Sequence, residues 1–175
     1  MNPTVAIIGA GPLGRWLALA AAQAGYRVLL EDVMPLNLRH AQEELRQRLT
    51  AEALPHVEFV STLEDAVREA DLAIDCVPDE LESKLEILWL LDRMAPPRTV
   101  LATPTTRLSI ADLAHCTYRP EKVLAIVAEV AALEAGRGEI VLRTTAASSA
   151  ETVELVRSFW EQLGFKPQFK EDGGR

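Results

Sequence analysis

Short runs of consecutive apolar residues alternate along the chain with segments in which apolar residues recur at helical spacing. Such runs are typical of strands buried on both faces, whereas the second pattern predicts amphipathic helices. The predicted strands are residues 4–8, 25–32, 57–60, 72–77, 100–103, 123–127, 139–143 and 166–169. The predicted helices are residues 12–24, 36–54, 63–70, 110–114 and 150–163, and a helix from residue 81 that Pro96 and Pro97 end.

This alternation of strand and helix predicts an α/β fold. A mostly parallel sheet needs helices on both faces, and right-handed crossovers place the first strand near the centre. A ligand then binds at the carboxyl ends of the strands, where the strand order reverses. We expect a single domain over residues 1–170 and a disordered tail over residues 171–175.

A glycine turn links the first strand to the first helix, because residues 9–14 read Gly-Ala-Gly-Pro-Leu-Gly. Gly9 permits a sharp turn out of the strand, Gly11 lets backbone approach a pyrophosphate, and Gly14 lets the helix lie close to the sheet. Pro12 suits the first turn of a helix, whose free N–H groups and dipole attract phosphate. The cofactor contacts predicted in this turn are Gly9, Gly11, Pro12, Leu13 and Gly14.

An acid closes the second strand, as a dinucleotide site requires. Asp32 follows Gly14 by 18 residues, close to the spacing of about 20 that such sites show. A carboxylate there accepts hydrogen bonds from ribose hydroxyls and repels a 2′-phosphate, so Asp32 favours NAD over NADP, and Glu31 adds negative charge beside it. FAD is the competing cofactor, and a turn that has lost its ligand is the structural alternative.

Charge and composition limit the kinds of partner that the chain is expected to bind. The net charge of −8 disfavours a nucleic-acid or anionic membrane surface. No apolar run approaches the roughly 20 residues of a membrane span, and no signal-peptide pattern precedes the first strand, so we expect a cytoplasmic protein. Cys76 and Cys116 are the only cysteines and lack a surrounding ligand cluster, so we expect separate thiols and no metal site.

Later segments make the chain similar to a known family. Residues 102–110 read Ala-Thr-Pro-Thr-Thr-Arg-Leu-Ser-Ile, where that family reads A-T-N-T-S-S-L-S-I. From about residue 4 to residue 170 the chain resembles the NAD-binding (N-terminal) domain of the 3-hydroxyacyl-CoA dehydrogenases. The resemblance implies a Rossmann-type, doubly wound fold, NAD as cofactor, and the oxidation of a 3-hydroxyacyl thioester with hydride transfer to NAD, as in fatty acid metabolism.

The resemblance extends the predicted cofactor site beyond the glycine turn. The family's acidic residue after the fourth strand corresponds to Asp79, and its cofactor-contacting lysine corresponds to Lys84. Val77 and Thr103, near the ends of two predicted strands, complete the cofactor contacts that the resemblance implies.

The family's catalytic histidine has no counterpart in this chain. Val127 stands at its position, whereas Glu139 corresponds to the glutamate that orients the imidazole and Thr106 to the serine that bonds the reacting oxygen. No histidine lies between residues 123 and 143. Glu129 would serve as a base only with a raised pKa and a reorganised loop.

These departures leave three hypotheses. The chain is an oxidoreductase of this class that acts on an acyl-CoA-type small molecule with a partner chain or on a smaller substrate, or a catalytically inactive NAD-binding module that works as a regulator or partner subunit, or an interaction domain without a ligand. The family's C-terminal helical domain would begin near residue 170, so we expect it to be absent and a homodimer or a partner chain to cover the apolar surface left exposed.

Overall fold

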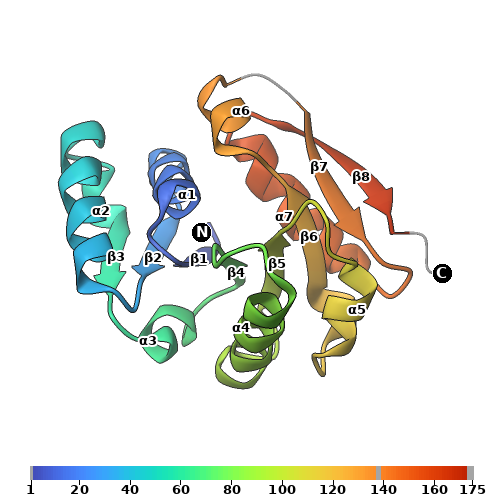
Figure 1. Cartoon of the computed structure of the whole chain (residues 1–175). Coiled ribbons are helices and arrows are strands. Elements are labelled where there is room, and N and C mark those ends of the chain that lie inside the picture. Colours follow the sequence, from blue (N-terminus) through green and yellow to red (C-terminus); the bar gives the residue numbers. More distant parts are fainter. Residues whose placement is uncertain (1, 137–138, 173–175) are drawn as a thin grey trace.

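The computed structural model describes residues 2–136 and 139–172, apart from the side chain of Glu139. Its strands form an eight-stranded sheet in the order β3-β2-β1-β4-β5-β6-β7-β8 (Figure 1). The strands are β1 (Thr4–Ile8), β2 (Arg27–Glu31), β3 (Val57–Val60), β4 (Leu72–Asp75), β5 (Val100–Pro104), β6 (Val123–Val127), β7 (Glu139–Thr144) and β8 (Lys166–Glu171). β7 runs antiparallel to β6, and the other neighbouring pairs are parallel. The predicted mostly parallel sheet with a central first strand is confirmed.

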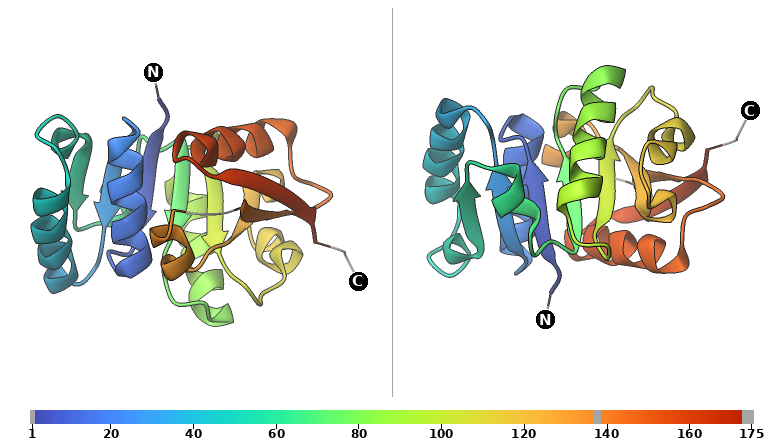
Figure 2. Two further views of the ribbon diagram at one scale, coloured as in Figure 1. Left: turned by 90° about the horizontal axis from the view of Figure 1, so that it is seen from above. Right: turned by 90° about the horizontal axis from the view of Figure 1, so that it is seen from below.

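Helices cover both faces of this sheet. They are α1 (Pro12–Gln23), α2 (Pro35–Arg48), α3 (Leu63–Val67), α4 (Leu81–Met94), α5 (Ile110–His115), α6 (Val130–Glu134) and α7 (Ala150–Gln162), with 3₁₀ turns η1 (Leu54–His56) and η2 (Pro120–Lys122). One buried cluster joins the sheet to α1, α2 and α7, and a second joins it to α3, α4 and α5. Figure 2 shows α4 and α7 on opposite sides of the sheet. The fold is therefore the single-domain, doubly wound Rossmann type.

α2 is shorter than the predicted helix at 36–54, because the chain turns after Arg48. Leu49 adopts an extended backbone and is buried in the core. The Ala53 N–H donates to the Thr50 hydroxyl at 3.2 Å, so a local side-chain bond holds a turn in place of another helical turn.

The end of the described chain differs from the predicted tail. Glu171 closes β8, and the Asp172 carboxylate receives the Arg143 guanidinium at 2.7 Å and the Ile110 N–H at 2.9 Å. Residues 171 and 172 therefore belong to the fold, since an ion pair and a strand hold them. Residues 173–175 lie outside the described part of the chain.

A membrane span and a metal cluster are both absent from residues 2–136 and 139–172. No helix there has the length and apolar character needed to cross a bilayer. No three His, Cys, Asp or Glu side chains group there so that they could hold a metal ion. Cys76 and Cys116 are both free thiols, which confirms the prediction of separate cysteines.

Candidate functional site

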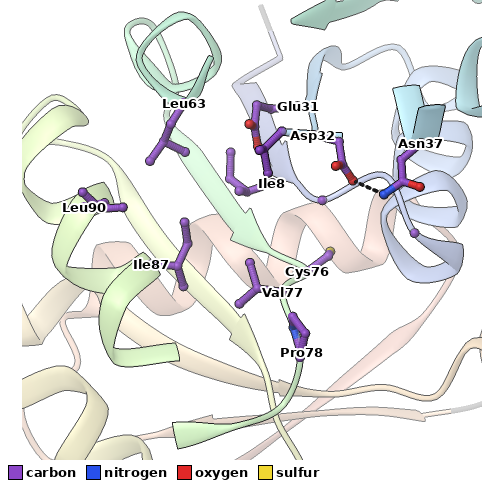
Figure 3. A pocket seen from close by; sticks show the side chains of 13 residues that line it. Ile8, Glu31, Asp32, Asn37, Leu63, Cys76, Val77, Pro78, Ile87 and Leu90 are labelled. Carbon is purple, nitrogen blue, oxygen red and sulfur yellow. Dashed lines mark hydrogen bonds between the residues drawn. The ribbon is translucent and has the colours of Figure 1, made fainter. Parts of the chain in front are cut away.

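The strand order reverses at β1, which has β2 on one side and β4 on the other. The segments that follow these three strands meet at the carboxyl edge of the sheet and enclose a cavity of about 480 Å³ (Figure 3). Four residues of the predicted cofactor site, Gly9, Gly11, Asp32 and Val77, line this cavity. The structure therefore brings the glycine turn and the acid together, where a doubly wound fold binds its ligand.

A smaller cavity of about 150 Å³ adjoins the first. Three further residues of the predicted site, Leu13, Asp79 and Thr106, line it. Cys76 and Val77 line both cavities, so the segment after β4 separates the two parts of one elongated site. An extended ligand such as a dinucleotide suits two such compartments.

The glycine turn has the tight geometry that its sequence predicts. Gly9 has a φ of +105°, a left-handed conformation that favours glycine. A Cβ built at Gly14 would lie 1.8 Å from the Gly9 carbonyl oxygen, so α1 contacts the turn through bare backbone. A Cβ at Gly11 would meet nothing within 4 Å, although Gly11 lines the cavity. The space beside Gly11 is therefore open to a ligand.

The N-terminus of α1 faces this open space. Gly11 is its N-cap, Pro12 is exposed at its first position, and no side chain caps it. First-turn N–H groups have no intrahelical acceptor, and the helix dipole adds positive potential there. These groups fit the pyrophosphate of a dinucleotide.

Asp32 is held tightly beside the turn and is only 8% exposed. Its Oδ2 accepts hydrogen bonds from the Ala10 N–H at 2.8 Å and the Asn37 side-chain amide at 3.1 Å, and its Oδ1 accepts one from the Met34 N–H at 2.8 Å. The carboxylate thus joins the glycine turn to the start of α2. Sequence patterns did not single out Asn37, whose only signal is its place in the first turn of the helix after the acid.

Glu31, the residue before Asp32, also lines the larger cavity. Its side chain is 6% exposed, and none of the described residues donates a hydrogen bond to its carboxyl group. Burial, and secondarily the charge of Asp32, raise the pKa of Glu31 to about 7. From the sequence, Glu31 was expected only to add negative charge beside Asp32, because alternation along a strand does not reveal which side of a cavity a residue faces.

We expect Glu31→Gln to stabilise the protein at high pH only. The folded protein binds the Glu31 proton more tightly than the unfolded chain, so the stability contributed by this group is complete below pH 4.5 and is lost as pH rises through about 7. Above that pH the ionised carboxyl costs about 1–3 kcal/mol. Calorimetry should therefore show a Tm increase of roughly 3–10 °C at pH 8.5 and little change at pH 4.5.

Glu161→Gln is the matched control, because Glu161 is exposed on α7. It should leave Tm unchanged at both pH values. An equal effect of Glu31→Gln at pH 4.5 and pH 8.5 would contradict the role assigned to the Glu31 charge.

The second cavity brings Asp79 and Thr106 together across the end of the sheet. The Thr106 N–H donates to Asp79 Oδ2 at 3.2 Å, and the Arg107 guanidinium donates to the Asp79 carbonyl at 3.1 Å. Asp79 Oδ1 is buried and has no partner among the described residues. Asp79 therefore lies at the wall of the smaller cavity with one carboxylate oxygen bonded to the Thr106 backbone and the other buried.

Lys84 does not line either cavity, so its position does not suit a direct contact with the cofactor. It is fully buried in α4, and its ammonium donates to Asp75 Oδ1 of β4 at 2.6 Å. Burial raises the pKa of Asp75, and Lys84 opposes that rise. Lys84 therefore supports the strand behind Cys76 and Val77. Thr103 is also fully buried, and neither cavity is lined by it.

The region expected to hold a catalytic base contains no histidine. The Thr105 N–H donates to the Ile126 carbonyl at 3.0 Å, so the loop with Thr106 lies against the end of β6, where Val127 stands. The histidines are His40 on α2, His56 in η1 and His115 at the end of α5, and none lines either cavity.

Glu129 and Glu139 follow Val127 in the chain. Glu129 is exposed at the start of α6, a helix that the sequence analysis missed. Glu139 begins β7, but its side chain lies outside the described residues. Burial raises the pKa of the Cys76 thiol, which therefore stays protonated and is a poor nucleophile. The described residues can hold a dinucleotide, and no histidine lines either of the two cavities.

The reversed strand order, the bare glycine turn and Asp32 define an NAD-binding Rossmann domain. The family model for "3-hydroxyacyl-CoA dehydrogenase, NAD binding domain" matches residues 4–168. The chain belongs to the 3-hydroxyacyl-CoA dehydrogenase family, and its cofactor is NAD.

Individual relatives agree with this assignment. The chain is 31% identical over 133 residues to a protein of Bacillus subtilis (strain 168) named "Probable 3-hydroxybutyryl-CoA dehydrogenase", covering 69% of this chain and 46% of that protein. The crystal structure of 3-hydroxybutyryl-CoA dehydrogenase from Escherichia coli K12 matches with a TM-score of 0.86 and 27% identity, over 98% of this chain and 39% of the other. The chain thus spans about half the length, or less, of these relatives.

A further solved structure supports the fold alone. The (S)-3-hydroxybutyryl-CoA dehydrogenase of Ralstonia eutropha matches with a TM-score of 0.88 at 22% identity, over 99% of this chain and 65% of that chain. Nearly all of the present chain therefore superposes on part of that enzyme.

Proposed function

We propose that this chain is an NAD-binding module of the 3-hydroxyacyl-CoA dehydrogenase family that does not oxidise a 3-hydroxyacyl thioester with its own residues. The observation that carries the proposal is Val127 at the end of β6, with no histidine lining either cavity. General acid–base assistance contributes about 10² to 10⁴ in rate, so its loss removes most of the useful turnover. We include a cytoplasmic location, and a regulatory or subunit role in fatty acid metabolism, in this proposal.

Different parts of a dinucleotide would bind in the two cavities. The first turn of α1 and the backbone at Gly11 would receive the pyrophosphate, and Asp32 would accept from ribose hydroxyls beside it. Asp79, which lines the smaller cavity, would lie near the other ribose. Bound NAD would supply a hydride acceptor, and the exposed Thr106 hydroxyl would orient a substrate oxygen near it.

A second candidate function is oxidation of an acyl-CoA-type 3-hydroxy substrate in a homodimer or with a partner chain. Asp79 and Thr106 favour this second function, because both place polar groups beside the smaller cavity. Binding of the adenosine half of NAD alone would not need these groups. The matched relatives named as 3-hydroxybutyryl-CoA dehydrogenases also support it. A base from another chain would then have to reach the end of β6.

We expect NADP to bind at least about tenfold more weakly than NAD, because a 2′-phosphate would meet the Asp32 carboxylate. Isothermal titration calorimetry of the wild-type chain with each dinucleotide measures this ratio directly. Asp32→Asn keeps an acceptor for the Ala10 N–H but removes the charge, so it should bring the affinities for NAD and NADP closer together. Equal affinities in the wild type would refute this role for Asp32, and no binding of either dinucleotide would refute the proposed function.

A further inference from the structure

The Glu31 carboxyl group lines the larger cavity, and none of the described residues donates a hydrogen bond to it. The Glu31 backbone carbonyl accepts from the Gly9 N–H at 2.7 Å, but none of the described residues donates to the side chain. Glu31 as a whole is 6% exposed, and what its side chain still exposes faces this cavity. Buried polar groups are normally satisfied by hydrogen bonds. A ligand that donates to Glu31 would therefore complete the site.

The position of Glu31 in the cavity indicates which part of a dinucleotide it meets. Glu31 pairs in register with Ile8, and Figure 3 shows its side chain beside Ile8 and on the side of Leu63. The Asp32 carboxylate points the other way, toward Asn37. Because successive side chains of a strand point to opposite faces, Glu31 faces a different part of the cavity from the ribose acceptor Asp32.

The rest of this cavity suits a purine base. Beyond Asp32 its walls are apolar and include Leu63, Val77, Ile87 and Leu90. Apolar side chains suit the faces of an aromatic ring, whereas the polar edge of the ring needs a hydrogen-bond partner. In NAD, adenine is the group that follows the ribose, and Glu31 is the unpaired polar group among these walls.

Adenine and a carboxyl group are complementary at this edge. Adenine presents a 6-amino donor next to a ring-nitrogen acceptor. A carboxylate accepts from the amino group, and a protonated carboxyl accepts from it while donating to the ring nitrogen. At its N7 edge hypoxanthine has a carbonyl oxygen in place of the amino group, so an ionised Glu31 at that edge would face acceptors only; the N1–H donor of hypoxanthine lies on the other edge.

We propose that Glu31 is a specificity-determining residue that accepts a hydrogen bond from the 6-amino group of adenine and selects 6-aminopurine dinucleotides over 6-oxopurine dinucleotides. The proposal rests on the NAD binding of the proposed function and is independent of hydride transfer. In this proposal Glu31 contacts the base and Asp32 contacts the ribose.

The test compares NAD with nicotinamide hypoxanthine dinucleotide by calorimetry at pH 8. The wild-type chain should bind the hypoxanthine compound at least about tenfold more weakly, as expected when a hydrogen bond to a charged group is lost. In Glu31→Gln the ratio should fall to about one, because an amide can rotate to accept from an amino group or donate to a carbonyl. Both dinucleotides carry the same charge, so repulsion between Glu31 and the phosphates cancels in the ratio.

Glu161→Gln, on the exposed face of α7, is the matched control and should keep the wild-type ratio. A ratio near one in the wild type, or a ratio that Glu31→Gln leaves unchanged, overturns the proposal while NAD binding stands. If neither dinucleotide binds to the wild type, NAD binding fails and the proposal fails with it.

Discussion

Replacing Gly14 by alanine is expected to destabilise the protein by about 3 kcal/mol or more and to weaken NAD binding at least a hundredfold. The added Cβ would lie 1.8 Å from the Gly9 carbonyl oxygen and 2.9 Å from its carbon. Both atoms belong to the backbone, and the Gly9 N–H is bonded to the Glu31 carbonyl, so α1 has to move away from the turn. Urea unfolding followed by tryptophan fluorescence measures the stability, and calorimetry measures NAD affinity.

Gly11→Ala is the matched control for this prediction. Gly11 has a φ of −72°, and its Cβ would meet nothing within 4 Å, so the fold should lose no more than about 0.5 kcal/mol. The methyl group would nevertheless stand where backbone approaches the pyrophosphate, so NAD affinity should still fall strongly. A Gly14→Ala protein as stable as the wild type would contradict the close packing of α1. A Gly11→Ala protein with full NAD affinity would contradict the assigned phosphate site.

Lys84→Met is expected to cost about 3–5 kcal/mol at pH 8, because it leaves Asp75 as a buried charge without its partner. The loss should shrink as pH falls toward 5. In this variant the folded-state pKa of Asp75 lies further above its unfolded value than in the wild type, so stability falls as pH rises through the folded pKa. Urea unfolding at pH 5 and pH 8 measures both effects.

The double variant Asp75→Asn/Lys84→Met separates the lost charge pair from the lost lysine side chain. It removes both charges and should recover much of the stability at pH 8, with little dependence on pH. Lys166→Met, at an exposed position in β8, should have no comparable effect. A Lys84→Met protein that matches the wild type at pH 8 would contradict the supporting role given to the ion pair.

The arrangement of the elements could be predicted because each local pattern agrees with the whole fold. Buried parallel strands read as continuous apolar runs, and the glycine turn and Asp32 lie at the sequence spacing that one βαβ unit imposes. The predicted bounds were wrong where individual side-chain hydrogen bonds or short segments determine where an element begins or ends. Thr50 accepts a hydrogen bond from Ala53 in the turn that follows α2, α6 is one short helix after β6, and Asp172 is paired with an arginine from β7.

The site was predictable as far as it depends on the backbone. The positions of the glycines and Asp32 are determined by the fold, and the structure brings Gly9, Gly11 and Asp32 to one cavity. Lys84 and Glu31 were harder, because their roles depend on the direction of a side chain. Lys84 was a cofactor contact only by the family resemblance, and its burial beside Asp75 is seen only in the structure. Glu31 was predicted only to add negative charge beside Asp32, and its place in the cavity is seen only in the structure.

The most direct test of this account measures binding and turnover on one sample of the wild-type chain. NAD affinity is determined by calorimetry, and NADH formation at 340 nm is followed with short- and medium-chain 3-hydroxyacyl-CoA substrates. The account predicts that NAD binds and that no turnover above background occurs, because Val127 supplies no base. Robust NADH formation by the chain alone would contradict it.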